Sequence, residues 1–281
     1  MENSFYTPSE VIKSNIKSAV AKANLPLAKM ILLGMMAGAF IAFGGAASSV
    51  AAHGVADVGL ARSIAGAIFP VGLMLVVFTG SELFTGNSLM IMAVIDKKIT
   101  LLKMIRNLVV VYFANFIGAL IIDVLVFLSG QFDFSGGGLG AYTIKVALAK
   151  TSIAPVTAVI SGILCNILVC LAIVLAGTAK DSIGRIFGIF FPIAAFVVCG
   201  FEHCVANMFY IPAGMLAATN TAYVQKAQEL YGITAQQCSS LTHFAGTESL
   251  LFVTIGNIIG GVLFVGVVLY MVHIKLSGKK S

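Results

Sequence analysis

Six stretches of this chain are long and apolar enough to cross a lipid bilayer, and no other feature restricts the fold as strongly. A membrane-spanning helix needs about 20 mostly apolar residues. The stretches run approximately over residues 28–52, 63–95, 108–128, 154–176, 186–218 and 250–273. We therefore expect an all-α membrane protein with six transmembrane helices.

The composition supports a membrane environment. Charged residues make up 10% of the chain and hydrophobic residues 59%, whereas soluble domains carry about 25% charged residues. So few charges would not cover the surface of a soluble fold of this size, so lipid must cover part of it. The first 30 residues are polar and rich in lysine, and we expect no cleavable signal peptide there.

The basic residues predict the orientation. Thirteen of the 17 Lys and Arg residues fall in segments that would share a side with the N-terminus, and four fall in the other segments. Positive charge is enriched on the cytoplasmic side of membrane proteins. We therefore expect a multi-pass protein of the cell membrane with both termini in the cytoplasm. This distribution also accounts for most of the net charge of +6, so a nucleic-acid partner is not expected.

The N-terminal segment, residues 1–27, has a helix signal of its own. Thr7-Pro8-Ser9-Glu10 matches a capping box with proline at the first helical position. Apolar residues then recur at helical spacing, with lysines between them. This pattern predicts an amphipathic helix on the inner membrane surface, with a frayed tail as the alternative.

The chain also repeats itself. Residues 80–87 match residues 200–207, because both have Gly first, Glu two positions later and Asn seven positions later. The following helix matches at Asn115 and Asn257. Each repeat, residues 28–130 and 151–274, holds three helices within a single channel domain. An odd number of crossings places the second repeat upside down in the membrane relative to the first.

The second apolar stretch of each repeat is too long for one plain helical crossing. Each of these stretches contains a polar interruption. Broken helices at matching positions of inverted repeats mark a transport site near the bilayer midplane. We expect the polar residues of the breaks to stabilise the conformation of the interrupted backbone, with the glutamates accepting hydrogen bonds from free backbone N–H groups. A carboxylate facing the pathway would repel an anion. This structural set comprises Gly80, Glu82, Asn87, Gly200, Glu202 and Asn207.

His203 is the sharpest transport candidate, because an ionisable residue at membrane depth is a functional hypothesis by default. Imidazole titrates near neutral pH and donates a hydrogen bond or a proton; a satisfied core histidine is the alternative. Thr85, in the first break, either faces His203 and the solute or bonds to its own loop.

The other candidate residues each allow two interpretations. Asn166 and Asn257 either line the path or bond to a neighbouring helix, and the second use is commoner. Lys150 and Lys29, at opposite mouths, either concentrate anions or anchor the interface. Large apolar residues flank the polar positions as packing residues or constrictions: Phe69, Leu73, Leu83, Phe84, Val169 and Phe196.

The segment Gly-Phe-Glu-His-Cys-Val-Ala-Asn-Met-Phe, residues 200–209, resembles the formate/nitrite transporter family together with residues 80–85 and 256–260. The resemblance covers residues 29–273 approximately. It implies an aquaporin-like fold, a homopentamer and one pore in each protomer.

The resemblance also implies roles for single positions. His203 matches the central pore histidine, Thr85 the threonine of the first break, and Asn257 an asparagine near the histidine. Phe69 and Phe196 match an outer constriction of the pore, and Leu73, Leu83 and Val169 match positions around an inner constriction. Lys150 matches a lysine of the outer vestibule, and Lys29 matches a lysine at the inner mouth. Residues 219–247 receive no role.

We therefore expect a channel, or a proton-linked channel, for small monovalent weak-acid anions. Formate is the first choice, with nitrite and hydrosulfide close behind and lactate and acetate as further substrates. A water- or glycerol-like channel for neutral solutes is the alternative. A membrane enzyme would need a nucleophile–base pair or a metal cluster, and the sequence suggests neither. The five cysteines form no CxxC pair, and we expect no metal and no cofactor.

Overall fold

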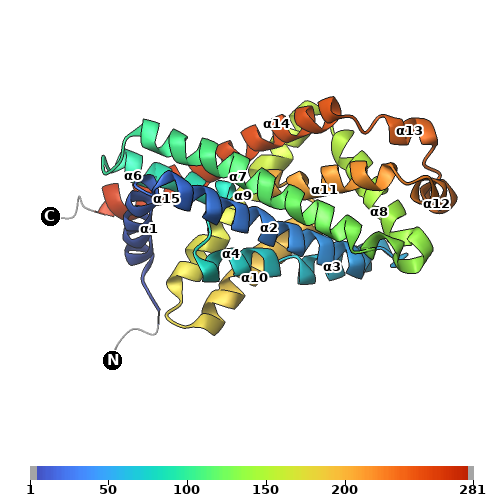
Figure 1. Ribbon diagram of the computed structural model, residues 1–281. Helices are drawn as coiled ribbons and strands as arrows, with labels where there is room; N and C mark the ends of the chain where they lie inside the picture. Colours follow the sequence, from blue (N-terminus) through green and yellow to red (C-terminus); the bar gives the residue numbers. More distant parts are fainter. Residues whose placement is uncertain (1–4, 278–281) are drawn as a thin grey trace.

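The computed structural model describes residues 5–277 and shows a bundle of helices (Figure 1). Six helical segments of the described chain are long and apolar enough to cross a membrane, which confirms the predicted architecture. They are α2 (Leu27–Ala52), α3 with α4 (Val58–Ile68 and Val71–Thr79), α7 (Leu101–Leu128), α9 (Pro155–Thr178), α10 (Ser182–Cys199) and a last one at Phe244–Lys275.

Shorter elements connect these spans. The last span begins in α14 (His243–Ile259) and continues through η3 (Gly260–Val267), α15 (Val268–Tyr270) and η4 (Met271–Lys275). The others are α1 (Pro8–Ala23), α5 (Phe84–Asn87), η1 (Ser88–Met90), α6 (Ile91–Ile95), η2 (Gln131–Asp133), α8 (Phe134–Thr151), α11 (Cys204–Ala218), α12 (Thr221–Tyr231) and α13 (Ala235–Ser239).

Both predicted breaks are present. Gly80 caps the C-terminus of α4 and Gly200 that of α10, and each glycine has a left-handed backbone, with φ of 68° and 72°. Glycine takes this conformation without the steric cost of a Cβ. After three more residues the chain restarts as α5 or α11, so two short helices begin inside the bundle.

Glycines bring two helix pairs into close contact. A Cβ at Gly38 of α2 would collide with the carbonyl group of Asn115 on α7. In the corresponding helix pair of the second repeat, a Cβ at Gly256 of α14 would collide with the carbonyl group of Val159 on α9. Small residues at such contacts let helix backbones approach closely in a membrane.

Helix α1 corrects one expectation. The capping box is present, because Thr7 N–H donates to the Glu10 carboxylate at 2.8 Å. Hydrogen bonds from Thr7 lower the pKa of Glu10. The apolar face, with Val11, Ile12 and Ile16, is buried against α6, α9 and η1. Helix α1 therefore packs on the protein at one end of the bundle (Figure 1) and does not rest its apolar face on the membrane surface.

The opposite end of the bundle holds α8, α12 and α13 (Figure 1). Helix α8 opens with three left-handed residues, Ser135, Gly136 and Gly137. Tyr223 of α12 donates to Asp133 at 2.6 Å. Burial and this carboxylate raise the pKa of Tyr223 to about 12, so the phenol remains a donor at neutral pH. Residues 219–247, which the sequence left without a role, thus fold back onto α8.

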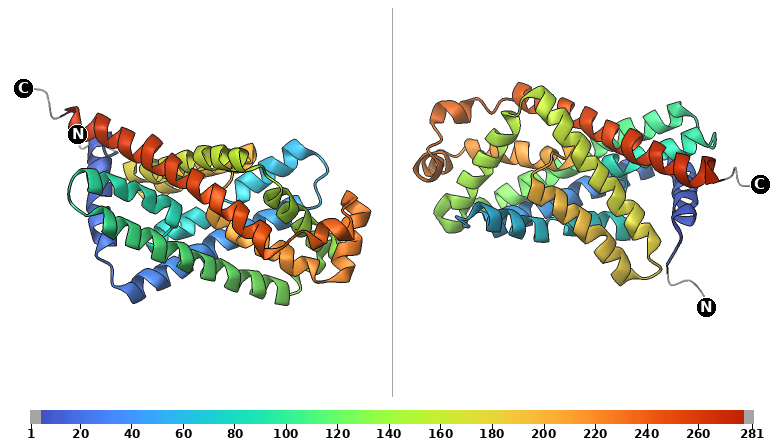
Figure 2. Two further views of the ribbon diagram at one scale, coloured as in Figure 1. Left: turned by 90° about the horizontal axis from the view of Figure 1, so that it is seen from above. Right: turned by 180° about the vertical axis from the view of Figure 1, so that it is seen from behind.

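The first and last described helices, α1 and η4, lie in contact at one end of the molecule (Figure 2). An even number of crossings requires this arrangement.

Candidate functional site

The two breaks meet at one pair of polar side chains. Thr85 Oγ1 lies 2.9 Å from His203 Nε2, and both side chains are buried. Of the two alternatives for Thr85, the structure selects contact with the histidine. One residue comes from the start of α5 and the other from the residue that precedes α11, so the site joins the two repeats.

The second ring nitrogen of His203 is also occupied. Nδ1 accepts the backbone N–H of Ala206 at 3.0 Å, which makes His203 the N-cap of α11. In a neutral imidazole only one nitrogen carries hydrogen. The hydrogen-bond network therefore assigns that hydrogen to Nε2, which donates to Thr85 Oγ1. The hydroxyl hydrogen of Thr85 is then left for another acceptor.

An aromatic pair lies beside the histidine. The Phe196 ring stacks on the imidazole with centroids 5.9 Å apart and planes inclined by 28°. Phe69 meets Phe196 edge to face at 5.6 Å. These are the residues predicted for the outer constriction, and both line the cavity described next.

A cavity of about 440 Å³ reaches this aromatic pair from one end of the bundle. We call it the Arg62 cavity. Its walls are the end of α2, α3, α8, α10 with the second break, and part of α11, and Tyr231 of α12 contributes as well. Its ionisable residues are His53, Arg62, Lys145, Lys150, Glu202 and His203, with three tyrosines.

A second cavity, of about 490 Å³, enters from the other end. We call it the Lys22 cavity. It lies between α1, the start of α2, α4 and the first break, and it is lined by Lys22, Lys29 and Glu82. The two cavities open at opposite ends of α2, whose 26 residues span about 39 Å.

The glutamates of the breaks correct another expectation. Glu202 binds the Lys150 ammonium at 3.0 Å through both oxygens and accepts from Asn207 at 2.7 Å. Glu82 likewise binds Lys22 at 2.7 Å and accepts from the amide of Asn87 at 2.7 Å. The carboxylates therefore pair with lysine and asparagine, whereas the Glu82 N–H donates to the Leu33 carbonyl and the Glu202 N–H to Ser161 Oγ. Lys150 lines the Arg62 cavity, and its charge is compensated by Glu202.

Lys22 was missed by the sequence reasoning, which treated it as a surface lysine of α1. It is the counterpart of Lys150, since each lysine lies in the last turn of the helix that precedes the first span of its repeat. That position, a few residues before Pro26 or Pro155, is the signal that would have identified the pair.

Asparagines on α7 and α14 satisfy the broken backbone. Asn115 Oδ1 accepts from Phe84 N–H at 3.0 Å, and Asn257 Oδ1 accepts from Cys204 N–H at 2.8 Å. Asn257 was predicted in the pore, but its amide bonds to helix and break backbone and it lines neither cavity.

Asn166 has a similar place. Its amide donates to the carbonyls of Asn257 at 2.6 Å and Thr85 at 3.2 Å. Both asparagines therefore act between helices, which was the commoner of the two readings.

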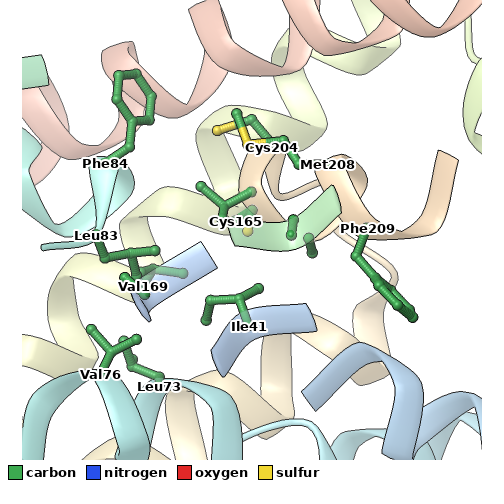
Figure 3. Close-up of a cluster of buried hydrophobic side chains, with 14 of the residues drawn as sticks. Ile41, Leu73, Val76, Leu83, Phe84, Cys165, Val169, Cys204, Met208 and Phe209 are labelled. Atoms are coloured by element: carbon green, nitrogen blue, oxygen red, sulfur yellow. The ribbon is translucent and has the colours of Figure 1, made fainter. Parts of the chain in front are cut away.

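The inner apolar positions divide into two groups. Leu73 and Leu83 line the Lys22 cavity, and Val169 is buried beside Leu83 (Figure 3). Phe84 points the other way, toward α14, and its ring lies 5.0 Å from that of Tyr112 in a separate apolar groove (Figure 3). Phe84 is therefore not placed as a constriction, because successive residues at the start of α5 face opposite sides.

Two cavities that approach one buried polar pair from opposite ends of a six-span bundle define the class of protein. It is a membrane channel or transporter. The model of the formate/nitrite transporter family matches residues 9–271, and the chain belongs to that family, which is one of transport proteins and not of enzymes.

Related proteins align with this chain over nearly its whole length. The chain is 36% identical to the formate channel FocA of Haemophilus influenzae, over 93% of this chain and 92% of that one. It is 37% identical to the formate channel BtFdhC of Bacillus thuringiensis, over 93% of each. Among solved structures, a pentameric formate channel with formate bound superimposes with a TM-score of 0.78 at 32% identity, covering 88% of this chain and 97% of that chain.

Proposed function

We propose that this protein conducts small monovalent weak-acid anions, formate first, through one pore in each protomer of a homopentamer. The observation that carries the proposal is a pair of cation-bearing cavities on either side of His203 and Thr85: one is lined by His203, and the other by Leu83 and Gly86, which flank Thr85 in the sequence. The names of the relatives, which are formate channels, favour formate over nitrite, hydrosulfide, lactate and acetate.

In this proposal the positive cavities gather the anion and the apolar positions remove its water. Phe69 and Phe196 form the constriction on one side, and Leu73 and Leu83 form that on the other. Hydrated ions do not pass such steps without losing hydration. Between them, the Thr85 hydroxyl donates its free hydrogen to the anion, and His203 holds the hydroxyl in place. The positive end of the α11 dipole adds to the attraction.

Proton linkage places a further demand on His203. A neutral ring that gave its Nε2 hydrogen to the anion would be left as an imidazolate, so the ring must first take a proton at Nδ1. That nitrogen accepts the Ala206 N–H in the resting site. Protonation therefore requires the first turn of α11 to release this bond. We propose that formate leaves as formic acid only when this release occurs.

The test is transport by purified protein in liposomes, with formate, nitrite, hydrosulfide, lactate and chloride followed from about pH 5 to 8. Selective weak-acid flux that is altered in His203→Ala supports the anion pore. Flux without pH dependence and without proton movement removes the proton-linked step and leaves hydrogen bonding. Passage of glycerol or water without anion flux would favour the neutral-solute channel.

A further inference from the structure

We propose that Arg62, Tyr142 and Lys145 form an anion-reception site in the Arg62 cavity. The site would hold a small monovalent carboxylate or oxyanion before it reaches Phe69 and Phe196. This inference rests on the proposed function, because it assigns the first binding step of the same pathway to side chains other than Lys150.

The charges of the cavity support the assignment. Glu202 is the only carboxylate among the described residues that line it, and both of its oxygens are bound by Lys150, with Asn207 on one of them. Lys150 therefore brings little net attraction. Within residues 5–277, no carboxylate lies within ion-pair distance of Arg62 or Lys145. Two positive charges of the cavity are thus uncompensated.

Both cations are held in place by contacts that leave their charge unneutralised. Arg62 Nη1 donates to the carbonyl oxygen of Val198 at 3.2 Å, near the end of α10. This bond uses one of five guanidinium N–H groups. Lys145 Nζ lies 4.4 Å from the centroid of the Tyr231 ring. A cation–π contact positions an ammonium group but does not cancel its charge.

Tyr142 adds a neutral donor that lines the same cavity. It lies three residues before Lys145 on α8, and residues at this spacing share a helix face. Its phenol is near enough to Arg62 and to Tyr231 to interact electrostatically with both. A guanidinium fork matches a carboxylate in two hydrogen bonds. The phenol and the ammonium then supply donors from the α8 side.

Among the described residues, the Lys22 cavity at the other end of the pore has fewer unpaired cations. In the Lys22 cavity, Lys22 is paired with Glu82, and Lys29 is the lysine among the described lining residues that has no ion pair. An anion therefore meets two uncompensated cations at one end of the pore and one at the other. Fields of one sign in a low-dielectric cleft raise the local concentration of the opposite charge. Capture should be stronger from the Arg62 cavity.

The test compares wild type with the double variant Arg62→Gln/Lys145→Gln in planar bilayers, with formate added to one side at a time. We expect the half-saturating formate concentration on the Arg62 side to rise about three- to tenfold at low salt. The maximal current and the values on the other side should stay within about twofold. High salt should shrink the difference, because it screens exposed charges.

Lys226→Gln is the matched control. It removes one positive charge at the same end of the molecule, where the double variant removes two, but Lys226 is paired with Glu229 on α12 and does not line the cavity. A double variant that behaves like this control, or that changes both sides equally, overturns the proposal. Tyr142→Phe should shift half-saturation in the same direction by a smaller factor.

A binding measurement separates this proposal from the transport proposal. Saturation-transfer NMR of formate on detergent-solubilised protein reports binding whether or not the pore conducts. We expect the signal of wild type and of Lys226→Gln to fall severalfold in the double variant. Binding that depends on these residues in a protein that passes no formate would keep the site and refute the proposed function. Equal signals in all three proteins would refute the site.

Discussion

At the scale of single residues, His203 performs two tasks with two nitrogens. Nδ1 caps α11 and Nε2 orients the hydroxyl of Thr85. A substitution of the histidine therefore disturbs a helix start as well as a polar contact. Thr85 separates the two effects, because its side chain takes part only in the second of these contacts.

Thr85→Val should lower formate flux about tenfold or more while the protein still folds. Valine has nearly the same shape but no hydroxyl, and a hydrogen bond to a charged group contributes about 1.5–3 kcal/mol. Flux into liposomes measures the effect. Thr85→Ser, which keeps the hydroxyl, is the control, and equal flux in the valine and serine variants would contradict the role assigned to Thr85.

Asp123 offers a prediction about stability. It lies on α7 with 0% of its surface exposed, and neither carboxylate oxygen has a hydrogen-bond partner among the described residues. A buried unsatisfied polar group costs about 1–3 kcal/mol. Asp123→Leu, which branches at the same carbon without polar atoms, should raise the melting temperature in detergent. Asp123→Asn keeps polar atoms and should gain less; a lower melting temperature for the leucine variant would indicate a hidden partner.

The two residues of the central pair could be singled out from the sequence, but their surroundings could not. His203 and Thr85 stand out because polar residues at membrane depth are rare. Lys22 does not, since its partner Glu82 is 60 positions away and only the fold brings them together. Phe84 was misplaced for a related reason: adjacent apolar residues at a helix start look alike in sequence although they face opposite sides.

At the scale of elements, α1 and α8 are each joined to a helix break by an ion pair between one lysine and the glutamate of that break. Lys22→Met should destabilise the protein, because it leaves Glu82 buried without its counter-charge. Removing one partner of a buried pair costs about 3–5 kcal/mol, and we expect the lower part of that range or less because Lys22 is partly exposed. Chemical denaturation would measure the loss.

The double variant Lys22→Met/Glu82→Gln tests the cause of that loss. It should recover most of the lost stability, since no unpaired charge remains. If the double variant were as unstable as the single one, the lysine would matter through packing and not through the ion pair.

The contact between α2 and α7 supplies another prediction. Gly38→Ala should lower stability by about 2 kcal/mol or more, because the new methyl group would collide with the Asn115 carbonyl and overpacking a tight contact is costly. Gly54→Ala is the control, since a Cβ there meets nothing within 4 Å. Thermal unfolding in detergent compares the two, and equal melting temperatures would refute the close contact.

The spans and breaks were predictable because hydrophobic length and a repeated motif are local signals. Helix α8 was not, because its first turn contains Ser135, Gly136 and Gly137, residues that read as a loop. The helix packs on α11 and α12, and only the fold supplies these contacts. Helix α1 was predicted as a helix, but its packing partner was not, since a sequence does not distinguish a face that covers lipid from one that covers protein.

At the scale of the whole molecule, the distribution of lysine and arginine predicts that α1 and η4 face the cytoplasm and that the Arg62 cavity opens outside. Protease sites added at the two termini should be protected in intact cells, whereas a site inserted between α12 and α13 should be cut. Immunoblotting of tagged protein measures cleavage. Cutting at the termini but not at the inserted site would reverse the orientation.

The paired breaks have a consequence for how such a pore arises by gene duplication. The two copies keep the same scaffold of glycine, glutamate and asparagine, but Leu83 stands where the other copy has His203, and Thr85 where it has Val205. Two identical halves related by symmetry would carry the same residue at both of these positions, either two histidines or two leucines. Fusing the copies into one chain releases that restriction, so a symmetric framework carries a single, directional polar centre.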